Sequence, residues 1–481
     1  MLEIKYPKKI VKCKDVEGKE NLLKKQRLQI DLKEPCVARF EKGSYVILDF
    51  GREMRGGVRV FTSGSDGSRI RIRFGESVAE CCSELGVCGI YTDNCQDQGI
   101  SEKAKRQNAT NDHANRDFYV SLPGWSNTPI GDTGFRFVRL DFEGEYVIKS
   151  VVAENTILKR RAKYIYKGDR EIEKIFTAAK RTIDLCVGSG YIWDGVKRDR
   201  LVWVGDLAPE ILALTTIYGR CKEIEESIDL AREHTPIPNY MDGICTYSLW
   251  WMIILKDYTD RVETDDFVLR QLDYLEALTA HFLKGINENG ETNYPMYFVN
   301  WPLYGTPEER EGFRAIAIVA MRSAAEILEK HGRNAAFARE ALDRFKKQPI
   351  TASSKVVAAL KYYATGSITD TERDILMSEG TKGMSTFMAY YILKAMAAFD
   401  KDHSVKIMKD YFGGMLALGS TTFWEEFDSE WASLGRIDRM PKKNQIMAHG
   451  DTGSHCYVGF RMSLCHGWAA GVIAFIKEYC E

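Results

Sequence analysis

The chain has 481 residues, of which 44% are hydrophobic and 28% are charged, with 67 Lys and Arg against 68 Asp and Glu. This composition is typical of a folded protein with more than one core and excludes a disordered chain. The near-zero net charge, with no dense basic block and no apolar run of about 18 residues, argues against nucleic-acid and membrane partners.

The N-terminal part of the chain shows the two-residue period of β-strands. Apolar and polar residues alternate in 44–51, 69–74 and 135–142, and glycine-rich turns separate these runs. The pattern predicts an antiparallel β-sandwich that occupies residues 1–160. Within it, the polar and aperiodic stretch 83–116 is expected to be a long loop between strands.

Further along the chain, the period changes to that of helices. Ile172, Ile175, Phe176 and Ile183 lie on one helical stripe. Amphipathic stretches continue to the end of the chain and predict an all-α domain over residues 161–481. An α/α toroid of helical hairpins fits their number, and an irregular bundle fits it nearly as well. The later stretches cover residues 209–218, 224–233, 247–258, 265–283, 311–330, 334–346, 353–363, 384–399, 404–418 and 463–479.

One short segment after the first helix combines acids, bases and tryptophans. Asp194, Asp199 and Asp206 are five and seven residues apart and lie close to Arg198 and Trp203. So many charges are costly to bury unless each has a partner, and an exposed loop needs no tryptophans. We therefore expect a semi-buried polar cleft. Two structural alternatives are a salt bridge between Asp199 and its arginine neighbours and a helix N-cap role for Asp206.

Tryptophans next to acids or amides mark further loops. Trp301 follows Asn300, and Trp424 precedes Glu425. Aromatic faces beside carboxylates suit a sugar, whose C–H faces stack on rings while its hydroxyls bond to acids and amides. Trp250 lies inside an apolar helix, where a core position is favoured, although it stays among the candidate sugar contacts.

Hydrolysis of a glycoside without a cofactor needs one protonated acid at the leaving oxygen and one carboxylate to activate water or attack carbon. Asp199 and Glu425 are the candidates for this pair. In three motifs, the chain also resembles the α-L-rhamnosidases, family 78 of the glycoside hydrolases. The motifs are 194–206, 419–425 and 463–468, and the stretches 48–57 and 134–137 resemble that family's auxiliary sandwich.

The resemblance implies an (α/α)6 barrel of the six-hairpin type and inverting exo-hydrolysis of terminal α-L-rhamnosyl groups. It puts Asp199 at the position of the general acid and Glu425 at that of the general base, a pair expected to stand roughly 6.5–9.5 Å apart. Together with the tryptophan contexts, it also gives a set of candidate sugar contacts. These are Asp194, Arg198, Trp203, Asp206, Trp250, Trp301, Trp424 and His455.

Three departures from the family pattern bear on the substrate. The family's general acid is commonly Glu, whereas Asp199 is one methylene shorter, and Asn300 precedes Trp301 where an Asp is expected. The family's C-terminal β-domain does not follow residue 481 either. A catalytically silent sugar-binding or scaffold protein on the same toroid, and a glycosidase for another sugar, are the alternatives.

Metal and cofactor chemistry is not expected. The histidines and cysteines between residues 449 and 466, and the cysteines between 81 and 95, lack the paired spacing that zinc sites usually show, and no phosphate-binding loop is found. The 12 cysteines are irregularly spaced and the N-terminus has no leader pattern, which indicates reduced thiols and a cytoplasmic protein. A carbohydrate is the expected partner, and a homodimer is left open.

Overall fold

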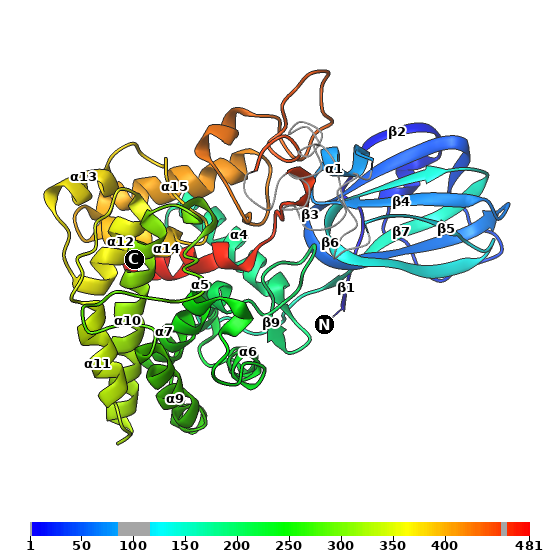
Figure 1. Cartoon of the computed structure of the whole chain (residues 1–481). Coiled ribbons are helices and arrows are strands. Elements are labelled where there is room, and N and C mark those ends of the chain that lie inside the picture. Colours follow the sequence, from blue (N-terminus) through cyan, green and yellow to red (C-terminus); the bar gives the residue numbers. More distant parts are fainter. Residues whose placement is uncertain (1, 85–115, 454–458) are drawn as a thin grey trace.

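A computed structural model describes residues 2–84, 116–453 and 459–481. It contains a β-sheet domain, formed by the N-terminal part of the chain, beside a larger helical body (Figure 1). The predicted architecture of an antiparallel sheet domain followed by a helical domain is therefore confirmed. Most of the predicted loop 83–116, and His455 among the candidate site residues, lie outside the described residues.

The sheet domain is antiparallel and closes around one apolar core. Its strand order is β1-β7-β3-β6-β4-β5, with β2 paired to β3. Strand β3 is 28 residues long, and its two ends pair with opposite edges of β7, so the sheet folds over on itself. The strands are β1 (Leu2–Lys5), β2 (Lys9–Glu17), β3 (Ala38–Ser65), β4 (Arg69–Gly75), β5 (Asp117–Ser121), β6 (Ser126–Phe142) and β7 (Tyr146–Thr156).

Two short elements join or flank the main structures: helix α1 (Val78–Cys82) follows β4, and the hairpin β8 (Val187–Gly188) and β9 (Tyr191–Ile192) precedes the acidic segment. The remaining helices of the described chain form the helical body. They are α4 (Arg170–Cys186), α5 (Val204–Tyr218), α6 (Lys222–Glu233), α7 (Cys245–Arg261), α8 (Asp265–Leu269), α9 (Leu272–Leu283), α10 (Glu308–Lys330), α11 (Ala336–Phe345), α12 (Lys355–Thr365), α13 (Asp370–Met377), α14 (Ala389–Ala397), α15 (Lys401–Ala417) and α16 (Val472–Tyr479).

The helical body is a closed ring of alternate helices. Helices α5, α7, α10, α12 and α14 pack each on the next, α14 packs on α16, and α16 packs back on α5. The C-terminal helix therefore lies among helices from the start of the domain (Figure 1). Most residues of helices α5 and α7 are buried, as expected for an inner ring, whereas α6 and α11 are amphipathic and lie outside.

Some predicted helices begin at other residues, for reasons that concern the site. Helix α5 begins at Val204 instead of residue 209, because the carboxylate of Asp242 accepts the Val204 N–H at 2.9 Å and caps the helix. Asp206 therefore lies in the first turn of α5, and the prediction that it is the N-cap is wrong. Helix α16 begins at Val472 instead of residue 463. The N–H groups of Ser463 and Leu464 bond to glutamate side chains, and those of His466 and Gly467 bond to backbone carbonyls of distant residues, so these groups do not form helical hydrogen bonds.

Two other helix predictions also differ from the structure. The single helix predicted over 265–283 is divided into α8 and α9 by a turn in which the Gln271 N–H bonds to the Val268 carbonyl at 2.8 Å. Helix α13 was not predicted, although Thr369 and Glu372 form a capping box at its start. None of the described helices is long and apolar enough to cross a membrane.

Candidate active site

The acidic segment between β9 and α5, called the strap here, has little regular secondary structure and is hydrogen-bonded to the chain before α16. Asp194 closes the strap, because its carboxylate accepts the Leu201 N–H at 3.0 Å. The Asp194 carbonyl accepts the Gly467 N–H at 2.6 Å, so the two segments run together. Asp199 and Arg200 have positive φ angles of 58° and 55°, a left-handed conformation that costs energy in residues with side chains.

Arg198 connects the two candidate catalytic carboxylates. Its Nη1 donates to Asp199 Oδ2 at 2.5 Å, and its Nη2 donates to Glu425 Oε2 at 2.6 Å. Its Nε donates to the Arg461 carbonyl at 2.7 Å, which fixes the plane of the guanidinium. Asp199 and Glu425 are thus brought together from positions more than 200 residues apart, and the expected salt bridge between Asp199 and an arginine is present.

Glu425 has one anchored oxygen and one that faces the site. Oε2 accepts the Ser463 N–H at 3.0 Å as well as the arginine. Oε1 has no hydrogen-bond partner among the described residues, although the side chain is only 2% exposed. The imidazole Nε2 of His466 lies 3.6 Å from Oε1. A carboxylate held in this way is oriented on one side and available for a ligand on the other.

A cavity of about 260 Å³, called the inner cavity here, lies in front of this oxygen. Carboxylates and aromatic rings converge on it, which is the composition expected of a sugar site. Its described lining consists of Asp194, Trp203, Asp206, Asp242, Gly243, Ile244, Tyr247, Met296, Phe298, Trp301, Glu425, His466 and Trp468.

Burial controls the protonation of these groups. It raises the pKa of Asp194 and Asp206 well above the ordinary range, and nearby carboxylates add to the effect. Burial also raises the pKa of Asp242 to about 6. It lowers the pKa of His466 well below its usual value, with Arg198 as a further cause. The cavity therefore presents a neutral imidazole and acids that keep their protons to higher pH than free carboxyls do.

The structure brings several predicted site residues together and leaves others out. Asp194, Trp203, Asp206, Trp301 and Glu425 line the inner cavity. Arg198 bonds to both Asp199 and Glu425, and neither Arg198 nor Asp199 is part of the described lining of the inner cavity.

Two predicted tryptophans are placed elsewhere. Trp250 is fully buried between Phe387 and Tyr391, in agreement with the core position that its apolar helix favours. Trp424 is also fully buried, where its Nε1 donates to Ser420 Oγ at 2.8 Å. The prediction that Trp424 presents a face to a sugar is wrong, because the segment around it turns into the helical core.

Several residues of the inner cavity were missed, among them His466, Trp468 and Asp242. His466 and Trp468 lie in the motif 463–468 that carried the resemblance, and their spacing of two residues was the available signal. Their rings are 4.2 Å apart in the structure. Asp242 lies in the short 3-10 turn Met241–Gly243 and has no signal in the sequence that separates it from other loop acids.

One cluster of side chains that could in principle bind a metal ion instead surrounds the ammonium group of a lysine. Among the described residues, ligand atoms of Glu76, Glu80 and His449 lie within 4.8 Å of one another. The ammonium of Lys197 lies 3.1 Å from Glu76 and 3.3 Å from Glu80. His449 bonds through Nδ1 to Ser77 Oγ at 2.8 Å. The cluster therefore neutralises its acids internally and fits a structural role.

The sheet domain supports the site directly. Glu76, which follows β4, accepts the Leu464 N–H through Oε2 at 2.6 Å, and Leu464 is next to the residue that anchors Glu425. Lys197 donates to the carbonyls of Phe460 and Met462 at 2.6 and 2.7 Å. These bonds satisfy a stretch of chain that has little regular structure, and they link it to the sheet.

Comparisons with known proteins agree with this geometry. A sequence model described as the bacterial α-L-rhamnosidase concanavalin-like domain matches residues 39–157. No curated protein matches the chain. Among solved structures, a rhamnosidase from Klebsiella oxytoca with rhamnose bound is similar over 100% of this chain and 96% of its own, with 16% identity and a TM-score of 0.73.

Two longer proteins are similar over part of their length. The family 78 rhamnosidase of Bacillus sp. GL1 is matched by 95% of this chain and over 48% of its own, with 16% identity and a TM-score of 0.70. The α-L-rhamnosidase of Dictyoglomus thermophilum is matched by 99% of this chain and over 51% of its own, with 14% identity and a TM-score of 0.63. The chain thus has the two-part fold of the family 78 α-L-rhamnosidases, and its sheet domain matches the sequence model of their bacterial members.

Proposed function

We propose that the chain is an exo-acting α-L-rhamnosidase that hydrolyses terminal α-L-rhamnosyl groups with inversion. The observation that carries the proposal is the buried oxygen Oε1 of Glu425, which has no partner among the described residues and faces a cavity walled by tryptophans and carboxylates. The fold shared with rhamnosidases, one of them solved with rhamnose bound, points to the same sugar.

In this proposal the terminal sugar occupies the inner cavity. Its ring stacks on Trp203 or Trp301, and its hydroxyls bond to Asp194, Asp206 and the imidazole of His466. Neutral carboxyl groups can donate as well as accept hydrogen bonds, so the raised pKa values of the two aspartates suit a neutral polyol.

The proposed chemistry uses two carboxyl groups. In the structure, Arg198 bonds to both side chains, and Asp199 lies outside the described lining of the inner cavity. In the proposed reaction, Asp199 leaves Arg198 and gives a proton to the glycosidic oxygen as the bond to the anomeric carbon breaks. Glu425 takes a proton from the water that attacks that carbon from the opposite face. The cycle ends when the product leaves, Asp199 regains a proton from solvent and Glu425 loses one.

The test compares wild type with Asp199→Asn and Glu425→Gln on an aryl α-L-rhamnoside. Each variant is expected to lose kcat by about 10²- to 10⁴-fold, the usual contribution of a general acid or base. Glu430→Gln is a matched control, because this acid lies exposed in the same region as Glu425. Unchanged turnover in both variants would contradict the assignment, and a silent wild type would favour a sugar-binding protein.

The anomeric configuration of the first product tests the inversion separately. Proton NMR of the first product is expected to show β-L-rhamnose, because inversion changes the configuration at the anomeric carbon. If the first product is the α-anomer, the reaction retains configuration, and Glu425 acts as a nucleophile instead of a base.

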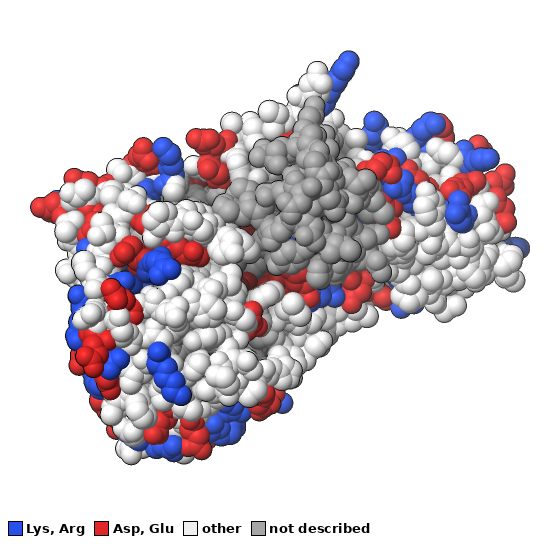
Figure 2. Space-filling model, viewed as in Figure 1, with Lys and Arg blue, Asp and Glu red and all other residues white. Residues whose placement is uncertain are grey.

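Further parts of the proposal concern the whole protein. We place the domain boundary near residue 160, expect a cytoplasmic location, and keep a homodimer and the six-hairpin arrangement as proposals. On the face shown in Figure 2, basic and acidic side chains are interspersed over both domains, which suits a neutral carbohydrate partner. Limited proteolysis, cell fractionation and light scattering test the boundary, the location and the oligomeric state.

A further inference from the structure

A groove of about 570 Å³, called the basic groove here, lies where strand β3, helices α4 and α15 and the chain that follows α15 meet. Its volume is in the range of small-ligand sites. The cations in its described lining outnumber the acids by four to one, whereas the whole chain has 67 Lys and Arg against 68 Asp and Glu. The described lining consists of Arg52, Arg170, Glu173, Lys174, Thr177, Ala178, Arg181, Leu416, Ser420 and Thr421.

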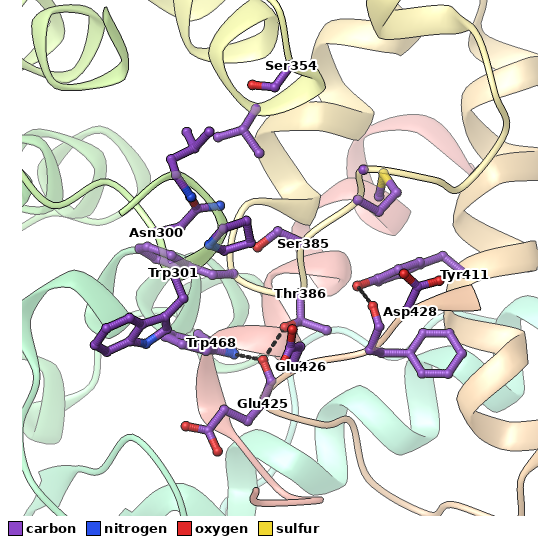
Figure 3. Close-up of a pocket in the computed structure, with 17 residues that line it drawn as sticks. Asn300, Trp301, Ser354, Ser385, Thr386, Tyr411, Glu425, Glu426, Asp428 and Trp468 are labelled. Carbon is purple, nitrogen blue, oxygen red and sulfur yellow. Dashed lines mark hydrogen bonds between the residues drawn. The ribbon is translucent and has the colours of Figure 1, made fainter. Parts of the chain in front are cut away.

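The basic groove is separate from the proposed active site. A cavity of about 400 Å³, drawn in Figure 3, shares Trp301, Glu425 and Trp468 with the inner cavity and therefore belongs to that site. None of the described residues that line these two cavities also lines the basic groove. A ligand of the groove is therefore a second ligand, and the inference does not rest on the proposed function.

Arg181 is a partly buried cation that forms no ion pair with any described acid. Its Nε donates to the Glu53 carbonyl at 2.9 Å, and its Nη2 donates to the same oxygen. Burial lowers the pKa of Arg181 to about 10, and the nearby charge of Arg52 adds to this effect. Both guanidiniums remain charged at neutral pH, and an anion bound beside them would remove their mutual repulsion.

Two acids close to these arginines offset their charge only in part. Glu53 is buried, and burial together with the charge of Glu76 raises its pKa well above the usual range, so its carboxyl group is neutral at pH 7 and does not balance Arg181. Glu3 lies 3.8 Å from Arg52, but two lysines lie closer to the same carboxylate, at 3.0 and 3.3 Å. The groove therefore keeps a positive charge.

A hydroxyl group supplements the two guanidiniums. Thr421 Oγ1 accepts the Glu53 N–H at 2.8 Å, which holds it beside Arg52, and its own hydrogen is donated to no described group. A phosphate carries a charge of about −1.5 to −2 at pH 7 and three strong acceptor oxygens, and arginine forks bind such oxygens in pairs. Two guanidiniums and one hydroxyl match a phosphate in charge and in hydrogen bonds.

The rest of the groove follows one face of α4. Arg170, Lys174 and Arg181 are four and seven residues apart, so they share this face, and the first lies about 16 Å from the last along the helix axis. Glu173, the acid of the described lining, lies about 12 Å from Arg181 on the same scale, and its Oε1 accepts the Gly168 N–H at 3.1 Å. The paired arginines are thus at the end away from the acid, with room along α4 for an attached organic group.

We propose that the basic groove binds a phosphate group, either as inorganic phosphate or as the monoester of a small metabolite. Arg52 and Arg181 bind its oxygens, and Thr421 donates a further hydrogen bond. In a monoester, the organic group lies along α4 towards Lys174 and Arg170.

The experiment is isothermal titration calorimetry of the whole chain with inorganic phosphate, glucose 1-phosphate and glucuronate. Glucuronate has a sugar ring like that of glucose 1-phosphate but carries one carboxylate in place of the phosphate. At least one of the two phosphates is expected to bind at least about tenfold more tightly than glucuronate, because it brings more negative charge to two guanidiniums. The affinity is expected to fall as sodium chloride is added.

Arg52→Gln is the decisive variant. The Arg52 side chain is 43% exposed, so its replacement leaves the fold intact, and the Kd for phosphate is expected to rise at least about tenfold. Arg27→Gln is the matched control, because it removes an exposed arginine that does not line the groove, and it is expected to leave the Kd unchanged. Unchanged melting temperatures of both variants without ligand verify their folding.

Glu173→Gln tests the charge argument in the opposite direction. It keeps an oxygen that can accept the Gly168 N–H and removes the acid of the described lining, so glucose 1-phosphate is expected to bind about twofold more tightly.

The two phosphates distinguish the sources of the ligand. Tighter binding of glucose 1-phosphate identifies a monoester, and binding of inorganic phosphate that is equal or tighter identifies the free ion, provided that the affinity depends on Arg52. Absence of binding by both phosphates, glucuronate binding as tight as theirs, or an unchanged Kd in Arg52→Gln would overturn the proposed site.

Discussion

Glu76 offers a sharp test of how the sheet domain supports the candidate catalytic carboxylates. It is fully buried, accepts the Leu464 N–H at 2.6 Å and lies 3.1 Å from the ammonium of Lys197. The neighbouring Ser463 N–H holds Oε2 of Glu425 at 3.0 Å. Glu76→Ala is expected to loosen this segment and to lower both stability and kcat, with a smaller effect on KM.

The magnitude follows from what the substitution leaves behind. Without Glu76, the buried Leu464 N–H has lost its acceptor, which costs about 1–3 kcal/mol. Lys197 keeps Glu80 and two carbonyls as partners, so its loss is smaller. We expect a decrease of about 2–4 kcal/mol in the free energy of unfolding, measured as a shift of the urea midpoint.

The pH dependence separates the charge from the hydrogen bond. Burial raises the pKa of Glu76 from 4.5 to about 7, against the opposing effect of Lys197. Because this folded-state pKa is raised, the corresponding stability is present below pH 4.5 and is lost as pH rises through about 7. Glu76→Gln cannot ionise, so its stability relative to wild type is expected to increase as pH rises from 4.5 to about 7.

Urea unfolding at several pH values and kcat on an aryl rhamnoside give the two readouts. Glu41→Gln is a control, because Glu41 is an exposed acid of β3. The reasoning is refuted if Glu76→Ala unfolds at the wild-type urea concentration, or if Glu76→Gln loses stability relative to wild type as pH rises.

Three further predictions concern groups around Glu425. Arg198→Met removes the cation that two carboxylates share and is expected to lower the free energy of unfolding by about 3–5 kcal/mol, and an unchanged urea midpoint would contradict this. Because the pKa of His466 is lowered in the folded protein, the stability that the neutral imidazole gives above pH 6.5 is lost as pH falls. His466→Gln is therefore expected to make the melting temperature less dependent on pH below 6.5. An equal decrease in the melting temperatures of wild type and variant at acidic pH would argue against this. A methyl group on Gly467 would overlap Glu210 Oε1, so Gly467→Ala is expected to cost about 1–3 kcal/mol. Glu210→Ala should restore part of the loss, and calorimetry that shows no recovery would disprove the clash.

The sequence predicted those parts of the site that depend on local composition. Asp194, Asp206 and Trp203 stood out because charged and aromatic residues rarely share a short segment unless a polar cleft surrounds them. The two-part fold was predictable for a similar reason, since strand and helix periods are local properties. The sequence did not distinguish the helices of the inner ring from those of the outer ring, although the apolar run in the first part of α7 was visible.

What the sequence did not predict depends on contacts between distant residues. Asp242, and not Asp206, caps α5, because a turn nearly 40 residues further on brings its carboxylate to the Val204 N–H. Trp424 looked like a cleft residue, because nothing local indicates that its segment turns into the core. His466 was noticed for its place in a motif, but its role at the cavity depends on Glu425 and Asp206, which lie 3.6 and 3.8 Å away.

The sheet domain supports the candidate active site directly. The segments that carry the candidate catalytic residues have little regular structure, so their backbone groups need partners from outside the helices. Arg55 donates to the carbonyls of Leu185 and Val187 at 2.6 Å, and Arg136 donates to the Gly419 carbonyl at 2.7 Å. With Glu76, these side chains hold the chain just before the acidic strap and the chain just before Glu425. A sheet that only shielded the toroid would not need buried charged side chains aimed at these two segments, and their presence explains how irregular straps can hold Arg198 and Glu425 in register.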